Sequence, residues 1–96
     1  MQRFESLTVA NTVQVLTQAE YNPILDLKAQ KALITVETAS FRFLVNGGSP
    51  TTSEGHLVGA GDSIELNCHD EIKKFKAIRD TATSATIRVT YFFQKD

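Results

Sequence analysis

The sequence predicts an all-β protein: a single β-sandwich domain, jelly-roll-like or immunoglobulin-like, of about seven or eight short antiparallel strands with at most one short helical turn. Several short stretches of the 96 residues alternate apolar with polar side chains, and breaks containing glycine, proline, asparagine or aspartate separate them. No internal repeat, charge block or low-complexity tract divides the chain, so residues 1–96 are expected to form one domain.

The first thirty residues show the weakest pattern. Two short strands joined near Ala10 and Asn11 are predicted by the apolar residues Phe4, Leu7, Val9, Val13 and Val15 or Leu16. The stretch that follows contains Pro23 and has no sustained period, so it is expected to be a loop. Residues 1–30 are therefore interpreted as a less regular portion that can serve as an attachment segment.

Two strands are predicted next along the chain. Ile34 and Val36 fall on one face of the first strand, and Phe41 and Phe43 fall on one face of the second. Only residues 38–40 connect the two strands. Because the connection is so short, we expect the second strand to pair back on the first.

The stretch NGGSPTT, which begins at Asn46, is predicted to form a rigid hairpin tip. Asparagine and glycine tolerate positive φ, and Pro50 stiffens the exit from the turn. A phosphate-binding loop would need wider glycine spacing that ends in lysine and serine or threonine and opens a helix, so nucleotide binding is not expected. A glycine-rich tight turn at Asp62 then leads into a strand with Ile64 and Leu66.

The last third of the chain predicts one helical turn and two strands. Asp70 is expected to cap the turn, and the chain then extends through Lys76 to Ile78. The apolar face of the final strand, the clearest in the sequence, consists of Ala85, Ile87, Val89, Tyr91 and Phe93. Phe92 places an aromatic ring on the opposite, polar face, where it is either an isolated exposed ring or part of a contact surface.

No catalytic, metal-binding or cofactor-binding constellation stands out. Cys68, His69 and Asp70 are neighbours and would point to opposite faces of a strand, and His56 is the only other histidine, so no metal is expected. Cys68 lacks an orienting third group for nucleophilic chemistry, and no acid–base pair is identifiable. The protein is therefore expected to be neither an enzyme nor a binder of a cofactor or small-molecule substrate.

Composition narrows the class of partner. A formal net charge of −1 leaves no long-range field to attract nucleic acid or an anionic membrane, so neither is expected as a partner. No stretch approaches the roughly 18 apolar residues of a membrane span, and Glu5 stands where a secretory signal would be apolar. A single cysteine allows no internal disulfide, so self-association or docking on a larger assembly is expected to complete the stability of so small a chain.

An ordered series of motifs runs through residues 31–93: ALITVETA, an RF strand ending in a turn, PT followed by GH, AGDSIEL, FKAIR and ATIRVTY. This series resembles small β-rich virion structural proteins of tailed bacteriophages and prophages. The resemblance implies a virion component, foremost a capsid decoration or cement protein, which is assembled in the bacterial cytoplasm, binds capsid or other virion proteins and forms a homo-oligomer on the particle. A head–tail or tail accessory protein is the alternative. Asn46 stands where the group commonly has aspartate, which bears on any binding role that needs a carboxylate there.

A shorter stretch, residues 42–51, is similar to a turn of β-sandwich modules that bind carbohydrate, which leaves host attachment through a glycan as a further alternative. Such a module would need exposed aromatic rings, for which Tyr21 and Phe92 are the candidates. We expect contact with a partner through the loop and the N-terminal segment. The interface candidates are Asn46, Gly47, Gly48, Ser49, Pro50, Thr51, Thr52, His56, Tyr21 and Phe92.

Overall fold

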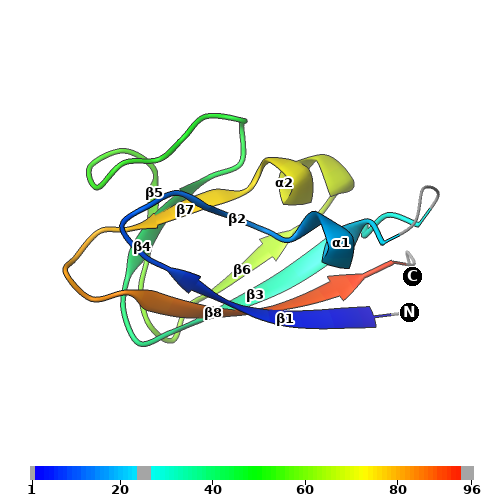
Figure 1. Cartoon of the computed structure of the whole chain (residues 1–96), viewed down its shortest axis with the longest axis horizontal. Helices are drawn as coiled ribbons and strands as arrows, with labels where there is room; N and C mark the ends of the chain where they lie inside the picture. The colour runs from blue at the N-terminus through cyan, green and yellow to red at the C-terminus, as the bar shows by residue number, and fades with distance from the viewer. Residues whose placement is uncertain (1, 24–26, 94–96) are drawn as a thin grey trace.

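A computed structural model describes residues 2–23 and 27–93, and these form a β-sandwich of two four-stranded antiparallel sheets (Figure 1). The elements, in chain order, are β1 (Gln2–Val9), β2 (Gln14–Val15), α1 (Gln18–Tyr21), β3 (Lys31–Glu37), β4 (Phe41–Leu44), β5 (His56–Val58), β6 (Ser63–Leu66), α2 (His69–Lys74), β7 (Lys76–Arg79) and β8 (Ala85–Phe92). The predicted all-β sandwich is confirmed.

The first sheet has the strand order β1-β8-β3-β6, and the second has β2-β7-β4-β5. The core lies between them. In β8 the side chains of Ile87, Val89 and Tyr91 are fully buried, while those of Thr86 and Arg88 face outward. Burial of each large apolar side chain contributes about 1.5–3 kcal/mol, so the predicted alternation of this strand supplies much of the packing energy.

The predicted pairing of the strands at residues 32–36 and 41–45 is wrong. β3 pairs with β6 and β8, whereas β4 pairs with β5 and β7, so residues 38–40 carry the chain from one sheet to the other. Thr38 takes a left-handed conformation (φ 81°) in this crossing, and the Ser40 hydroxyl donates to the Asp80 carboxylate over 2.6 Å. The alternation of apolar residues shows which side chains of a strand are buried. It does not show which sheet the strand joins, because both sheets bury side chains in the same core.

The N-terminal third is more regular than the sequence indicates. β1 is an eight-residue strand paired with β8 along its whole length. The segment expected to be a loop contains α1, whose last residue, Tyr21, is buried. The described residues therefore hold two short helices where one turn was predicted. The predicted turn is α2, which begins at His69 and leads into β7 as expected. The prediction that Asp70 caps it is wrong, because Cys68 is the N-cap residue and Asp70 lies within the first turn.

Candidate interaction surfaces

The loop between β4 and β5, residues 45–55, lies at the end of the molecule remote from the chain termini (Figure 1). Its base is braced by Arg42, whose guanidinium donates from Nε to the Thr52 carbonyl (3.1 Å) and from Nη1 to the Gly55 carbonyl (3.0 Å). Gly55 has φ 129°, and a Cβ there would lie 3.2 Å from both the Arg42 Cβ and the Phe43 carbonyl. The chain therefore returns to β5 through a position that only glycine fits without strain.

Hydrogen bonds within the loop fix its shape. The Asn46 Oδ1 atom accepts from the Gly48 N–H (2.9 Å), and Thr51 and Glu54 exchange backbone hydrogen bonds of 2.9 and 3.3 Å. Lys76 of β7 donates from Nζ to the Gly47 carbonyl over 3.3 Å. An amide at position 46 performs this structural role as well as a carboxylate would, and the loop is a preformed surface.

The structure places most of the predicted loop candidates at the surface. The exposed members are Asn46, Gly47, Gly48, Ser49, Thr51, Thr52 and His56. Pro50 is buried, with its Cβ 3.3 Å from where a Cβ at Gly55 would lie, so it supports the loop from beneath. The His56 ring packs 5.5 Å from the Phe43 ring, which itself stacks on Phe75 at 5.5 Å and so joins the loop base to the core.

Tyr21 is not an exposed ring. It is 8% exposed, and its ring centroid lies 6.2 Å from that of Tyr91 and 5.8 Å from that of His69. Burial raises the pKa of its phenol. Tyr21 lines a surface pocket of about 250 Å³, together with Gln18, Asn22, Lys28, His69 and Lys73. The sequence around Pro23 has no regular spacing of apolar residues, so it did not indicate that Tyr21 is buried.

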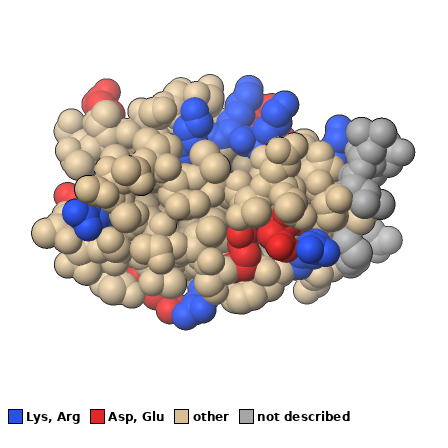
Figure 2. All heavy atoms as spheres, in the orientation of Figure 1, with Lys and Arg blue, Asp and Glu red and all other residues tan. Residues whose placement is uncertain are grey.

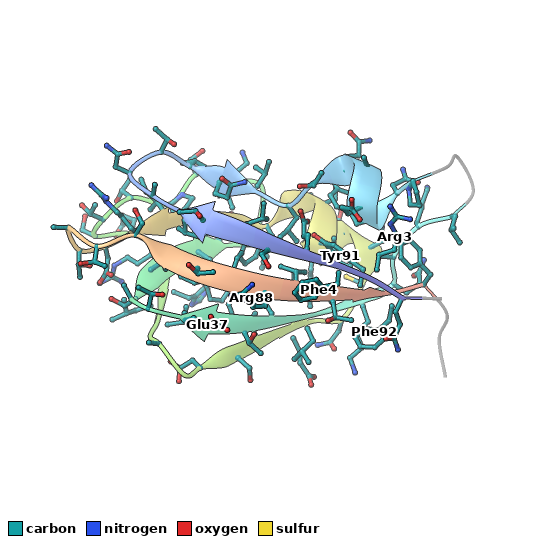
Figure 3. All side chains as sticks on the ribbon, turned by 60° about the horizontal axis from the view of Figure 1, so that its bottom comes forward. Arg3, Phe4, Glu37, Arg88, Tyr91 and Phe92 are labelled. Carbon is teal, nitrogen blue, oxygen red and sulfur yellow. The ribbon has the colours of Figure 1, made fainter. Side chains whose placement is uncertain are left out.

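The outer face of the first sheet carries an apolar patch, defined here as the outer patch, made of Phe4, Leu33, Thr90 and Phe92. Phe4 lies directly across from Thr90, which lies directly across from Leu33, and Phe92 follows on the same face of β8 (Figure 3). Phe4 is 59% exposed, and Phe92 is partly covered by the Lys31 ammonium, 5.9 Å from its ring centroid. The sequence could have placed Phe4 on the outer face. Alternate residues of a strand share a face, and Phe4 is an odd number of positions from both Leu7 and Val9.

Arg88 lies beside the outer patch and connects three strands (Figure 3). Its Nη1 donates to the Ser6 hydroxyl of β1 over 2.8 Å, and its Nε and Nη2 each lie 3.4 Å from the Glu37 carboxylate of β3. Exposed ion pairs of this kind contribute about 0–1 kcal/mol. Arg88 therefore orients side chains on this face more than it stabilises the fold.

A polar cluster lies beneath β1. The Tyr91 hydroxyl donates to Glu5 Oε2, and the Thr17 hydroxyl donates to Glu5 Oε1 over 2.6 Å. Arg3 pairs with Glu20 of α1 at 3.0 Å. Burial is the main cause that raises the pKa of Tyr91 well above its usual value of 10.0, and the hydrogen bond to Glu5 and the negative charge of Glu5 raise it further. Both Glu5 oxygens are occupied, so the cluster fastens α1 to the sheet.

Across residues 2–23 and 27–93, no group of three histidine, cysteine, aspartate or glutamate side chains is placed to hold a metal ion. Cys68 is exposed, and the neighbouring His69 contacts the Ala29 carbonyl through Nδ1 at 3.1 Å. In the same part of the chain, no helix is long and apolar enough to cross a membrane.

Comparison with known proteins gives no match to any family model, curated sequence or solved structure.

Proposed function

We propose that this chain is a structural component of a tailed-phage virion, a capsid decoration or cement protein that binds the shell through the β4–β5 loop and the N-terminal segment. The observation that carries the proposal is the preformed loop, held by Arg42 and by its own hydrogen bonds at one end of a rigid sandwich. The motif series of residues 31–93 supports the virion setting.

The mechanism is binding. Immobilising a flexible side chain on binding opposes association by about 0.5–1.5 kcal/mol, and a loop ordered during folding avoids most of that loss. The exposed side chains of Asn46, Ser49, Thr51 and Thr52 offer hydrogen-bond donors and acceptors to a protein surface. A decoration protein that contacts neighbouring shell subunits adds buried interface area and so stabilises the assembled shell.

Fractionated particles test this role. Particles from a phage that encodes this chain would be separated into heads and tails, and the chain in each fraction quantified by mass spectrometry. We expect it in the heads, in proportion to the major shell protein. Recovery in the tails alone would favour the accessory role instead, and absence from both fractions would overturn the virion proposal.

The loop can be tested by adding purified protein back to heads that lack it. Arg42→Ala removes both braces of the loop and should weaken binding to the heads by about tenfold or more. Arg79→Ala is the matched control, because Arg79 lies in β7 of the same sheet and its guanidinium donates to the Ser84 hydroxyl, which is outside the loop. Equal binding by both variants would exclude the loop as the attachment site.

One observation favours a second candidate, a carbohydrate-binding module: Phe4 and Phe92 share the outer face of one sheet. Exposed rings on such a face can stack against sugar rings. A glycan array probed with the wild type and with Phe4→Ala tests this. Binding that the variant loses would support the module, and an array without binding would eliminate it.

A further inference from the structure

We propose that the chain self-associates through the free edge of β1, which pairs with β1 of a second copy in antiparallel register, Phe4 lying opposite the partner subunit's Phe4. The occupant of this edge is a second copy of the same chain. The inference rests on the backbone and side chains of β1 and holds whether or not the protein belongs to a virion.

The hydrogen bonds of the first sheet show which backbone groups of β1 are free. Val36 donates to the Asp62 carbonyl at 3.0 Å, so its backbone faces β6, and alternate residues of β3 face β8. In β8, the even-numbered residues lie opposite the odd-numbered residues of β3 and direct their backbone groups toward β3. The odd-numbered residues of β8, such as Tyr91, therefore direct theirs toward β1, where they lie opposite odd-numbered residues. The backbone N–H and C=O groups of Gln2, Phe4, Ser6 and Thr8 therefore point away from the sheet.

This edge is long and unprotected. β1 has eight residues, compared with four in β6, which forms the other edge of the same sheet. Within the described part of the chain, no additional backbone hydrogen bond involves residues 2–9. β1 contains no proline and no lysine. Soluble proteins normally block such an edge with those residues, a bulge or inward-pointing charges, or cover it. The inward charges of β1 are already engaged within the chain, Arg3 with Glu20 and Glu5 with Tyr91 and Thr17, so they do not oppose pairing, and the free backbone groups indicate a partner.

The side chains of β1 are complementary to a second β1. A register that places Phe4 opposite the partner subunit's Phe4 also places Gln2 opposite the partner subunit's Ser6, so free backbone groups meet free backbone groups. It sets Arg3 opposite the partner subunit's Glu5, so no like charges face each other across the pair. A shift by two residues would instead set Glu5 opposite the partner subunit's Glu5, and like charges repel.

The pairing also covers the most exposed part of the outer patch. Phe4 is 59% exposed in the single chain and would contact the same ring of the second copy across the two-fold axis. Two four-stranded sheets would then continue into one another, with the two outer patches side by side. Arg88 already holds Ser6 from the same face, so the geometry of this end of β1 is fixed before association.

Sedimentation equilibrium over a range of concentrations tests the proposal. The wild type should be a dimer, and Phe4→Lys, which sets two ammonium groups opposite each other, should raise the dimer dissociation constant by about tenfold or more. Leu57→Lys is the matched control, because Leu57 is 55% exposed on β5, an edge strand of the other sheet. A monomeric wild type, or a dimer that Phe4→Lys leaves intact, would overturn the proposal.

Amide hydrogen exchange gives a second reading that does not depend on a lysine variant folding. The amides of Gln2, Phe4 and Ser6 should become protected as protein concentration rises, while those of Glu5 and Leu7 are protected at every concentration. Ser6→Pro removes the outward N–H together with the hydroxyl that accepts from Arg88, and should abolish the concentration dependence, whereas Ser6→Ala removes the hydroxyl alone and should keep it. Uniform protection of the three outward amides at all concentrations, or their exposure in a demonstrated dimer, would contradict pairing through β1.

Discussion

Val89 lies opposite Glu5 on one side and Ile34 on the other, and none of its surface is exposed. Val89→Asp would bury an unpaired carboxylate there, at a cost of several kcal/mol that a domain of this size does not have in reserve. We expect loss of the cooperative thermal transition measured by circular dichroism. Thr35→Asp is the control, because Thr35 is exposed and lies opposite Arg88. A cooperatively folded Val89→Asp variant would contradict this description of the core.

Tyr91 combines a fully buried ring with a hydroxyl that donates to Glu5. Tyr91→Phe keeps the ring and removes the donor, so the free energy of unfolding in urea should fall by about 1 kcal/mol at neutral pH. An unchanged free energy would mean that water satisfies Glu5 equally well in the variant.

The same tyrosine should make stability depend on alkaline pH. Burial and the Glu5 carboxylate raise the pKa of Tyr91 in the folded state above the value of 10.0 expected when the chain is unfolded. The resulting stabilisation is complete below pH 10.0 and falls as the pH rises above 10.0. Above that pH the unfolded chain releases the phenol proton of Tyr91, whereas the folded chain keeps it. Above it, the wild type should lose stability more steeply than Tyr91→Phe, by about 1.4 kcal/mol per pH unit. Parallel urea-unfolding profiles would refute this assignment.

Among the elements, the β4–β5 loop depends on Gly55. Its φ is 129°, and a Cβ added at this position would lie within 3.3 Å of three heavy atoms. Gly55→Ala should therefore lower the free energy of unfolding by about 1–3 kcal/mol. Gly59→Ala, whose Cβ would meet only the Asp62 carboxylate at 3.7 Å, should change it by about 0.5 kcal/mol or less. Equal effects in chemical denaturation would show that the loop base adapts.

The alternation of β8 and β3 was readable from the sequence because burial of one face imposes a period of two. The pairing of β3 was not, since Ile34 has the same pattern whether its strand neighbours β4 or β8. α1 was missed because its four residues are too few to show a helical period. β1 was underestimated because its inward positions include Arg3 and Glu5, whose burial is only partial.

The candidate surfaces were predictable in part. The glycine pair and Pro50 identified a rigid turn, and Phe92 was placed correctly on the polar face of its strand. That Phe4 joins Phe92 on one surface follows from the β1–β8 register, which depends on contacts between the two ends of the chain. Sequence patterns within a single strand carry no information on such a register.

For the whole molecule, the proposed surfaces lie apart. The loop occupies one end of a body about 38 Å long, and the free edge of β1 runs toward the chain termini at the other (Figure 1). In Figure 2 several Lys and Arg side chains gather along the upper edge, and Asp and Glu side chains lie in smaller groups elsewhere on the same face. Shell binding through the loop can therefore occur together with pairing through β1, whereas the part of the N-terminal segment that forms β1 would face the second copy and not the shell.

Docking should also raise thermal stability. A partner that binds only the folded chain stabilises it by mass action. We expect this chain to unfold at a higher temperature on phage heads than in dilute solution, as followed by limited proteolysis during heating. The Arg42→Ala variant, which is expected to bind the heads weakly, should show a smaller difference. Identical unfolding temperatures for the bound and free chain would argue against a docking function.

An electron cryomicroscopy reconstruction of the heads tests the central claim most directly, namely that this sandwich is a shell component attached by its preformed loop. We expect density for the two-sheet domain on the shell, with the β4–β5 loop touching shell subunits. Heads that contain no such density, or a domain whose loop points into solvent while another surface meets the shell, would contradict it.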